Sequence, residues 1–173
     1  MIQLQPKTLQ RIRDHLLDVG QPPSVHFMRV AADDDPFAGD PDGKARFEAL
    51  FEAMYLMVVV DGEVADSERE VLRGAVRGLT DGSVRTHHIQ KLFEKCDELV
   101  KQGIDKRIAA IAPTLKEDPA LSEAAFSLAS AIAFADSEIK DEENDLINEL
   151  AGALDIDGDR AEELLNQLEA DSE

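Results

Sequence analysis

Residues 55–79 read YLMVVVDGEVADSEREVLRGAVRGL, and residues 130–154 read SAIAFADSEIKDEENDLINELAGAL. Each stretch contains an apolar helical run, an Asp-x-Glu-apolar segment, an acidic helix start and a second amphipathic helix. The stretches lie 75 residues apart and share, in register, Asp61/Asp136, Glu63/Glu138, Asp66/Asp141, Glu68/Glu143 and Leu79/Leu154. This repeat predicts an internal duplication of a helix–acidic corner–helix unit. We name residues 61–65 the first acidic corner and residues 136–140 the second acidic corner.

The apolar pattern along the rest of the chain is helical, which predicts an all-α fold, a compact bundle of about seven to eight helices. Residues 1–43 are predicted to be an N-terminal extension made of one helix and a linker, and residues 44–173 to be the main domain. Helices are predicted over residues 44–60, 66–79, 89–100, 105–115, 119–135 and 141–154, with a last helix that begins near Asp157 or Asp159. Gly103 is predicted to end the third of these helices, and Asp105 to cap the next.

Composition is typical of a soluble globular protein, since 43% of the 173 residues are hydrophobic and 32% are charged. The single cysteine, Cys96, excludes an intrachain disulfide and favours a reducing compartment. No stretch approaches the ~20 apolar residues that a membrane span requires. The N-terminus, MIQLQPKTLQRIRDHLL, lacks the apolar segment of a secretory signal. We therefore expect a cytoplasmic protein without membrane insertion, and the sequence sets no oligomeric state.

The net charge of −19 is concentrated in one part of the chain. Residues 1–116 carry 19 acids and 16 bases, whereas residues 117–173, the acidic section, carry 18 acids and two bases, Lys140 and Arg160. Such a surface repels phosphate backbones, which argues against nucleic-acid binding. It attracts divalent cations or a basic protein partner.

The acidic corners have two physical interpretations, which do not exclude each other. Asp61 and Asp136 follow apolar helices, where the negative end of the helix dipole disfavours a carboxylate. In the first interpretation Asp66 and Asp141 cap the following helices, and acidic residues stabilise the first helical turn, namely Glu68 and Glu143. In the second interpretation a hard cation binds among four carboxylates, those of Asp61, Glu63, Asp136 and Glu138. A ligand set made only of oxygen favours Ca²⁺ or Mg²⁺ over zinc.

The segments VVVDGEVADSEREVL (58–72), AIAFADSEIKDEENDLI (131–147) and DIDGDRAEELL (155–165) resemble the TerB-like domain family, which is named for a bacterial tellurite-resistance protein. The resemblance covers about residues 44–170. It implies an all-α fold of about seven helices with an internal duplication, and an acidic metal-binding region where the corners meet. Carried over by position, that region consists of Asp61, Glu63, Glu68, Asp136, Glu138 and Glu143.

Other residues give no sign of catalysis. The chain has no glycine-rich phosphate loop, serine elbow or zinc motif. Cys96 lies on an apolar stripe and is predicted to be a core residue, and the neighbouring His87 and His88 diverge on a helix. The segment DIDGD at 155–159 lacks the glycine and glutamate that an EF-hand loop needs, so it is predicted to be a helix connection with an aspartate N-cap.

These observations favour a non-enzymatic TerB-like interaction or scaffold protein, related to stress response, with a divalent cation at its two acidic corners. The alternative is a metal-free adaptor whose acidic face binds a basic protein partner. A remote third hypothesis is a hydrolase that uses a carboxylate-bound metal.

Overall fold

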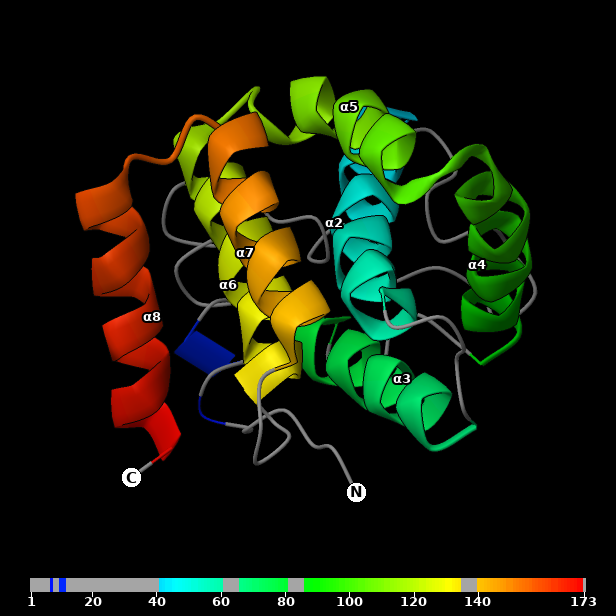
Figure 1. Cartoon of the computed structure of the whole chain (residues 1–173). Helices are drawn as coiled ribbons and strands as arrows, with labels where there is room; N and C mark the ends of the chain where they lie inside the picture. Colours follow the sequence, from blue (N-terminus) through cyan, green and yellow to red (C-terminus); the bar gives the residue numbers. More distant parts are fainter. Residues whose placement is uncertain are drawn as a thin grey trace.

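The computed structural model describes residues 7, 10–11, 41–60, 66–80, 86–134 and 140–172. Within these residues the chain forms only helices and their connections, which confirms the all-α prediction (Figure 1). The elements are α2 (Pro41–Val59), α3 (Asp66–Thr80), α4 (Thr86–Leu99), the 3-10 turn η2 (Val100–Gln102), α5 (Ile104–Leu115), α6 (Pro119–Phe134), α7 (Asp141–Ala153) and α8 (Gly158–Ser172). None of the described helices combines the length and the apolar character that crossing a membrane needs.

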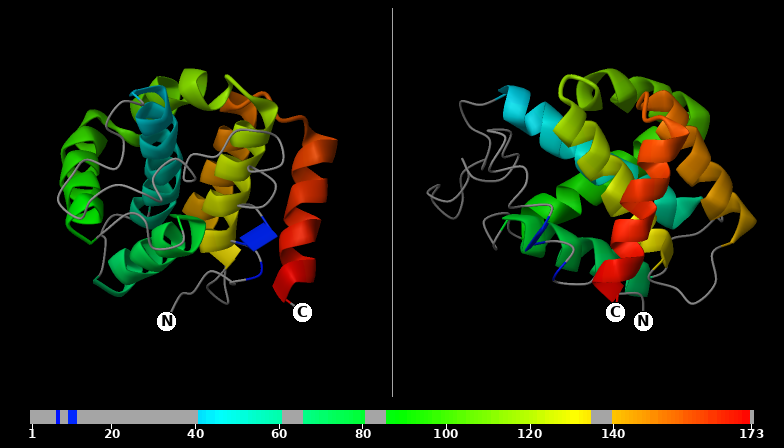
Figure 2. Two further views of the ribbon diagram at one scale, coloured as in Figure 1. Left: turned by 180° about the vertical axis from the view of Figure 1, so that it is seen from behind. Right: turned by 90° about the vertical axis from the view of Figure 1, so that its left-hand side faces the viewer.

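The centre of the molecule is the pair α2 and α6, which contact each other more extensively than any other two described elements. Every α2 residue from Ala49 to Val58 is buried, and so is every α6 residue from Ala120 to Ala133 except Glu123. Figures 1 and 2 show that the two helices run in the same direction and finish at the same end of the molecule. A helix that is apolar on all sides has to be covered on all sides, so the remaining helices surround this pair.

Complementary side-chain sizes explain the close contact between the central helices. The buried positions of α6 are rich in small residues, namely Ala120, Ser122, Ala124, Ala125, Ser127, Ala129, Ser130, Ala131 and Ala133. The larger buried side chains come mainly from α2, namely Phe47, Leu50, Phe51, Met54, Tyr55, Leu56 and Met57. Burying each large apolar side chain contributes roughly 1.5–3 kcal/mol, so the pair supplies much of the stability of the fold.

The outer helices are amphipathic and bury one stripe each, as their sequence periodicity predicts. Helices α3, α4 and α5 contact α2, whereas α7 and α8 contact α6. The buried stripes are Val71, Leu72, Ala75 and Val76 on α3; Ile89, Leu92, Phe93 and Cys96 on α4; Ile108, Ile111, Ala112 and Leu115 on α5; Leu146, Ile147 and Leu150 on α7; and Leu164 and Leu168 on α8.

Two predicted helix starts are wrong, and a third is confirmed. The helix predicted from Lys44 begins at Pro41. Gly103, not Asp105, occupies the N-cap of α5; its φ of 104° lies in the region that favours glycine, and Asp105 lies in the first turn. Asp157 does cap α8, because its Oδ1 accepts the backbone N–H of Arg160 at 2.8 Å.

The helix ends that flank the acidic corners repeat the spacing found in the sequence. Val59 ends α2 and Phe134 ends α6, 75 residues later, and α3 and α7 begin at Asp66 and Asp141, again 75 residues apart. The internal duplication itself stays a prediction. Of the predicted N-terminal extension, only residues 7, 10–11 and 41–43 are described, all of them helical.

We expect Ala129→Leu to destabilise the fold by about 1–3 kcal/mol, because close-packed interiors have little room for added methylene groups. Ala129 is fully buried on α6. Urea unfolding followed by circular dichroism measures the effect. The matched control is Ala109→Leu on the exposed side of α5, which should change stability by no more than about 0.5 kcal/mol. Equal effects of the two substitutions would contradict close packing of α6.

Candidate functional site

Most of the predicted corner ligands lie outside the described residues. Asp61, Glu63, Asp136 and Glu138 are in this group. Glu68 belongs to the first turn of α3, but its side chain is also outside the described part. Glu143 is therefore the one candidate ligand whose side chain is placed. The six-residue ligand set stays a prediction that the structure does not test.

Glu143 is part of the start of α7. It is the third residue of the helix, and its Oε2 accepts the backbone N–H of Lys140 at 2.9 Å. Lys140 occupies the N-cap position with an extended backbone, so the prediction that Asp141 is the N-cap is wrong: Asp141 is the first helical residue. The first-turn role predicted for Glu143 is confirmed, because its carboxylate satisfies a backbone donor that has no partner within the helix.

The acidic section forms a strongly charged exterior on α7, α8 and the turn between them. Its exposed carboxylates are those of Asp141, Glu142, Asp145, Glu149, Asp155, Asp157, Asp159, Glu162, Glu163 and Glu169. Among the side chains that the structure describes, no three His, Cys, Asp or Glu gather closely enough to hold a metal ion. The described acidic charge is therefore spread over a surface and is not concentrated at one point.

Like charges meet directly where α5 and α7 come together. The pKa of Glu149 is raised above its usual value, first by partial burial and then by its hydrogen bond and charge interaction with Asp105. A raised carboxyl pKa means that the folded state disfavours the ionised form. The surface therefore carries electrostatic self-repulsion that a bound cation or a basic partner would relieve.

Arg160 joins α8 to the centre of the molecule. Its guanidinium donates to both carboxylate oxygens of Glu123 on α6 at 2.8 Å, and to Glu163 at 2.8 Å. These contacts raise the arginine pKa further. Beside this fork is a cavity of about 300 Å³ at the α7–α8 turn, across which Lys116 reaches Asp155 at 3.3 Å. The cations around this cavity are already matched by carboxylates.

A buried ion pair on the opposite side of α2 was not predicted from the sequence. Arg107 on α5 donates through Nε and Nη2 to Glu52 on α2 at 2.5 and 3.0 Å. Their side chains are only 13% and 7% exposed. The hydrogen bond to Glu52 raises the pKa of Arg107. The available signal was the single glutamate inside the apolar run of α2.

The ion pair lines a cavity of about 160 Å³ between α2, α4 and α5. Cys96 also lines this cavity, and the thiol is buried, as predicted. Burial raises the pKa of Cys96, with a further contribution from the charge of Glu52. A thiol that resists ionisation is a poor nucleophile, which agrees with the predicted core role. His87 is exposed and His88 half-buried on α4, as expected for residues that diverge on a helix.

Comparison with known proteins identifies one family. The sequence model of the family described as Tellurite resistance protein TerB matches residues 45–166. The match extends from the first described turn of α2 into α8 and includes both acidic corners and the Glu52–Arg107 pair. Comparisons with curated proteins and with solved structures give no match.

We expect Arg107→Met to destabilise the fold by about 3 kcal/mol, because it leaves the buried Glu52 carboxylate without its cation. The double variant Glu52→Leu/Arg107→Met should recover most of the loss, since apolar side chains can replace a buried ion pair. Chemical denaturation measures both. Lys101→Met is the control, because the Lys101–Glu98 pair on the exterior has side chains 69% and 73% exposed, and it should change little. A double variant as unstable as Arg107→Met would contradict this account.

Proposed function

Because the chain belongs to the family described as Tellurite resistance protein TerB, we propose that it is a non-enzymatic interaction protein of the cytoplasm that acts in a stress response. Its two acidic corners together hold one divalent cation, Ca²⁺ or Mg²⁺. The acidic section then presents its remaining negative charge to protein partners.

The parallel arrangement of α2 and α6 is the observation that supports this proposal. The two helices finish at the same end of the molecule (Figures 1 and 2), and each is followed at once by an Asp-x-Glu segment. The chain therefore leaves the central pair twice at one end, each time carrying two carboxylates. Two negative helix-dipole ends also lie there, which adds to the need for positive charge.

The donor set suits a hard cation. Asp61, Glu63, Asp136 and Glu138 offer only carboxylate oxygens, which Ca²⁺ and Mg²⁺ prefer. Glu68 and Glu143 stand at the starts of α3 and α7. Although Glu143 accepts one backbone N–H, an ionised carboxylate has about four acceptor positions, so it retains capacity for a metal. A bound ion would neutralise charge from both corners and connect them.

Titration of Ca²⁺ and Mg²⁺ into chelator-treated protein should show saturable binding, with a dissociation constant on the order of micromolar. Asp61→Asn/Asp136→Asn should abolish it, because one ligand is lost from each corner. At about 100-fold excess over the dissociation constant, the ion should stabilise the wild-type fold by about 2.7 kcal/mol. Isothermal titration calorimetry and thermal unfolding are the measurements.

A matched control is Glu94→Gln/Glu117→Gln, which removes the same charge from two exposed positions on α4 and beyond α5. This variant should bind the cation as the wild type does. Loss of binding in both double variants would indicate general electrostatic attraction instead of a site. Absence of binding in the wild type would refute the metal part of the proposal.

The alternative function, a metal-free adaptor for a basic partner, is supported by a separate observation. Glu162 and Glu169 are exposed on α8 and lie seven residues apart, hence on one face of the helix. The described acids are spread along α7 and α8, as a surface for a basic segment requires. This arrangement needs no bound ion.

For the adaptor, a lysine- and arginine-rich peptide should bind the chelator-treated protein, and the affinity should fall steeply toward about 1 M salt, where the Debye length is only about 3 Å. Glu162→Gln/Glu169→Gln should weaken binding, measured by fluorescence anisotropy. Glu94→Gln/Glu117→Gln again provides the equal change of charge elsewhere. Binding that is insensitive to salt, or equally weakened by both variants, would count against an α8 docking face.

A further inference from the structure

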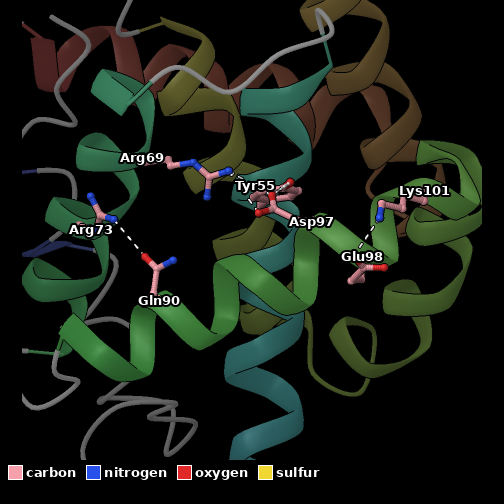
Figure 3. Close-up of polar contacts among 7 residues, drawn as sticks. All are labelled: Tyr55, Arg69, Arg73, Gln90, Asp97, Glu98 and Lys101. Atoms are coloured by element: carbon pink, nitrogen blue, oxygen red, sulfur yellow. Dashed lines mark hydrogen bonds and ion pairs between the residues drawn. The ribbon is translucent and has the colours of Figure 1, made fainter.

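One carboxylate on α4 contacts both helices that flank the first acidic corner (Figure 3). The Tyr55 hydroxyl of α2 donates to Oδ1 of Asp97. Nη2 of Arg69, in the first turns of α3, lies 3.2 Å from each Asp97 oxygen. The helix before the corner and the helix after it are thereby tied to the same side chain. We name Tyr55, Arg69 and Asp97 the Asp97 clamp.

An aromatic contact from α4 supports the same geometry. The Phe93 ring meets the Phe51 and Tyr55 rings of α2 edge to face, with centroids 5.3 and 6.3 Å apart. The guanidinium groups of Arg69 and Arg73 on α3 lie over the Phe93 ring, 4.9 and 5.5 Å from its centroid. Phe93 therefore fills the angle between α2 and α3 beneath the clamp.

The protonation of the clamp is fixed by burial. Tyr55 is only 2% exposed, and burial, together with the bond to Asp97, raises the pKa of its phenol. The hydroxyl therefore keeps its proton and remains a donor at neutral pH. Asp97 accepts from it on one side and faces the permanent charge of Arg69 on the other. The Arg73–Gln90 hydrogen bond, at 3.3 Å, adds a second tie between α3 and α4.

The second acidic corner has no equivalent of this clamp. At the 75-residue spacing, the positions of Tyr55, Arg69 and Asp97 are occupied by Ser130, Asn144 and Ser172. None of these can form a tyrosine–carboxylate–arginine group. Ser130 is completely buried, and its hydroxyl has no hydrogen-bond partner. The two corners, alike in their carboxylates, therefore differ in how their flanking helices are held.

From this difference we infer that Asp97 is a positioning residue for the first acidic corner. The clamp sets the angle between α2 and α3, so the first corner is organised before a ligand arrives, whereas the second corner adapts to it. The part of this inference that concerns cation affinity rests on the proposed function. The part that concerns the angle between α2 and α3 does not.

Hydrogen exchange of the full, metal-free chain tests the clamp directly. Asp97→Asn and Tyr55→Phe should each accelerate exchange in peptides that cover residues 56–70 and leave residues 131–145 unchanged. The double variant should exchange no faster than the faster single variant, because both remove the same interaction. Glu48→Gln is the matched control: it breaks another ion pair between α2 and α4, Lys95–Glu48 at 2.7 Å, that does not involve α3. It should leave both segments unchanged.

A purely structural role for Asp97 predicts a different result, because general destabilisation accelerates exchange at both corners together. Equal acceleration over residues 56–70 and 131–145, or no change over residues 56–70, would overturn the clamp. Calcium titration then tests the consequence for the site: Asp97→Asn should bind Ca²⁺ about tenfold more weakly than the wild type, as expected for loss of a group that orients ligands. Unchanged affinity would overturn that consequence. If the wild type itself binds no cation, the metal proposal fails, and the exchange experiment still decides the clamp.

Discussion

The close packing of α2 against α6 is the constraint on which the rest of the structure depends. Both helices are buried around their circumference, so neither is stable without a complete cover of other helices. The cover divides accordingly, with α3, α4 and α5 on α2 and with α7 and α8 on α6. The functional consequence is positional: because the central helices run in the same direction, the chain emerges from the core twice at one end, and each time it carries an acidic corner.

Complete burial of α2 also explains where the internal ion pairs occur. A charged or polar group on such a helix has no water beside it, so a covering helix has to supply its partner. Arg107 of α5 does so for Glu52, and Asp97 of α4 does so for the Tyr55 hydroxyl. These contacts fix the covering helices in specific places, whereas apolar packing alone would allow them to slide. On α6 the corresponding polar group, Ser130, is left without a partner.

One-sided periodicity allowed the amphipathic helices to be predicted from the sequence, and their buried stripes agree with the structure. A helix buried on all sides has no such period, so Tyr55 and Glu52 were not recognised as buried. The Glu52–Arg107 pair joins positions 55 residues apart, a distance that no local pattern reveals. The cap of α7 was misassigned because aspartate is a common N-cap residue, yet here Glu143 reaches back to the Lys140 N–H. The corner carboxylates were found by their repetition, and their geometry lies outside the described residues apart from Glu143.

The two proposed ligands of this protein, a divalent cation and a basic partner, relieve the same electrostatic strain. Residues 117–173 hold 18 acids against two bases, and one of these bases, Arg160, is engaged by Glu123 and Glu163. The raised pKa of Glu149 beside Asp105 shows that repulsion already acts within the folded surface. Whichever cationic ligand binds first reduces the negative potential available to the second, and by linkage the reduction is reciprocal. The second corner belongs to this acidic section, whereas the first is held by the Asp97 clamp. Negative coupling between the ligands would therefore act chiefly through the second corner.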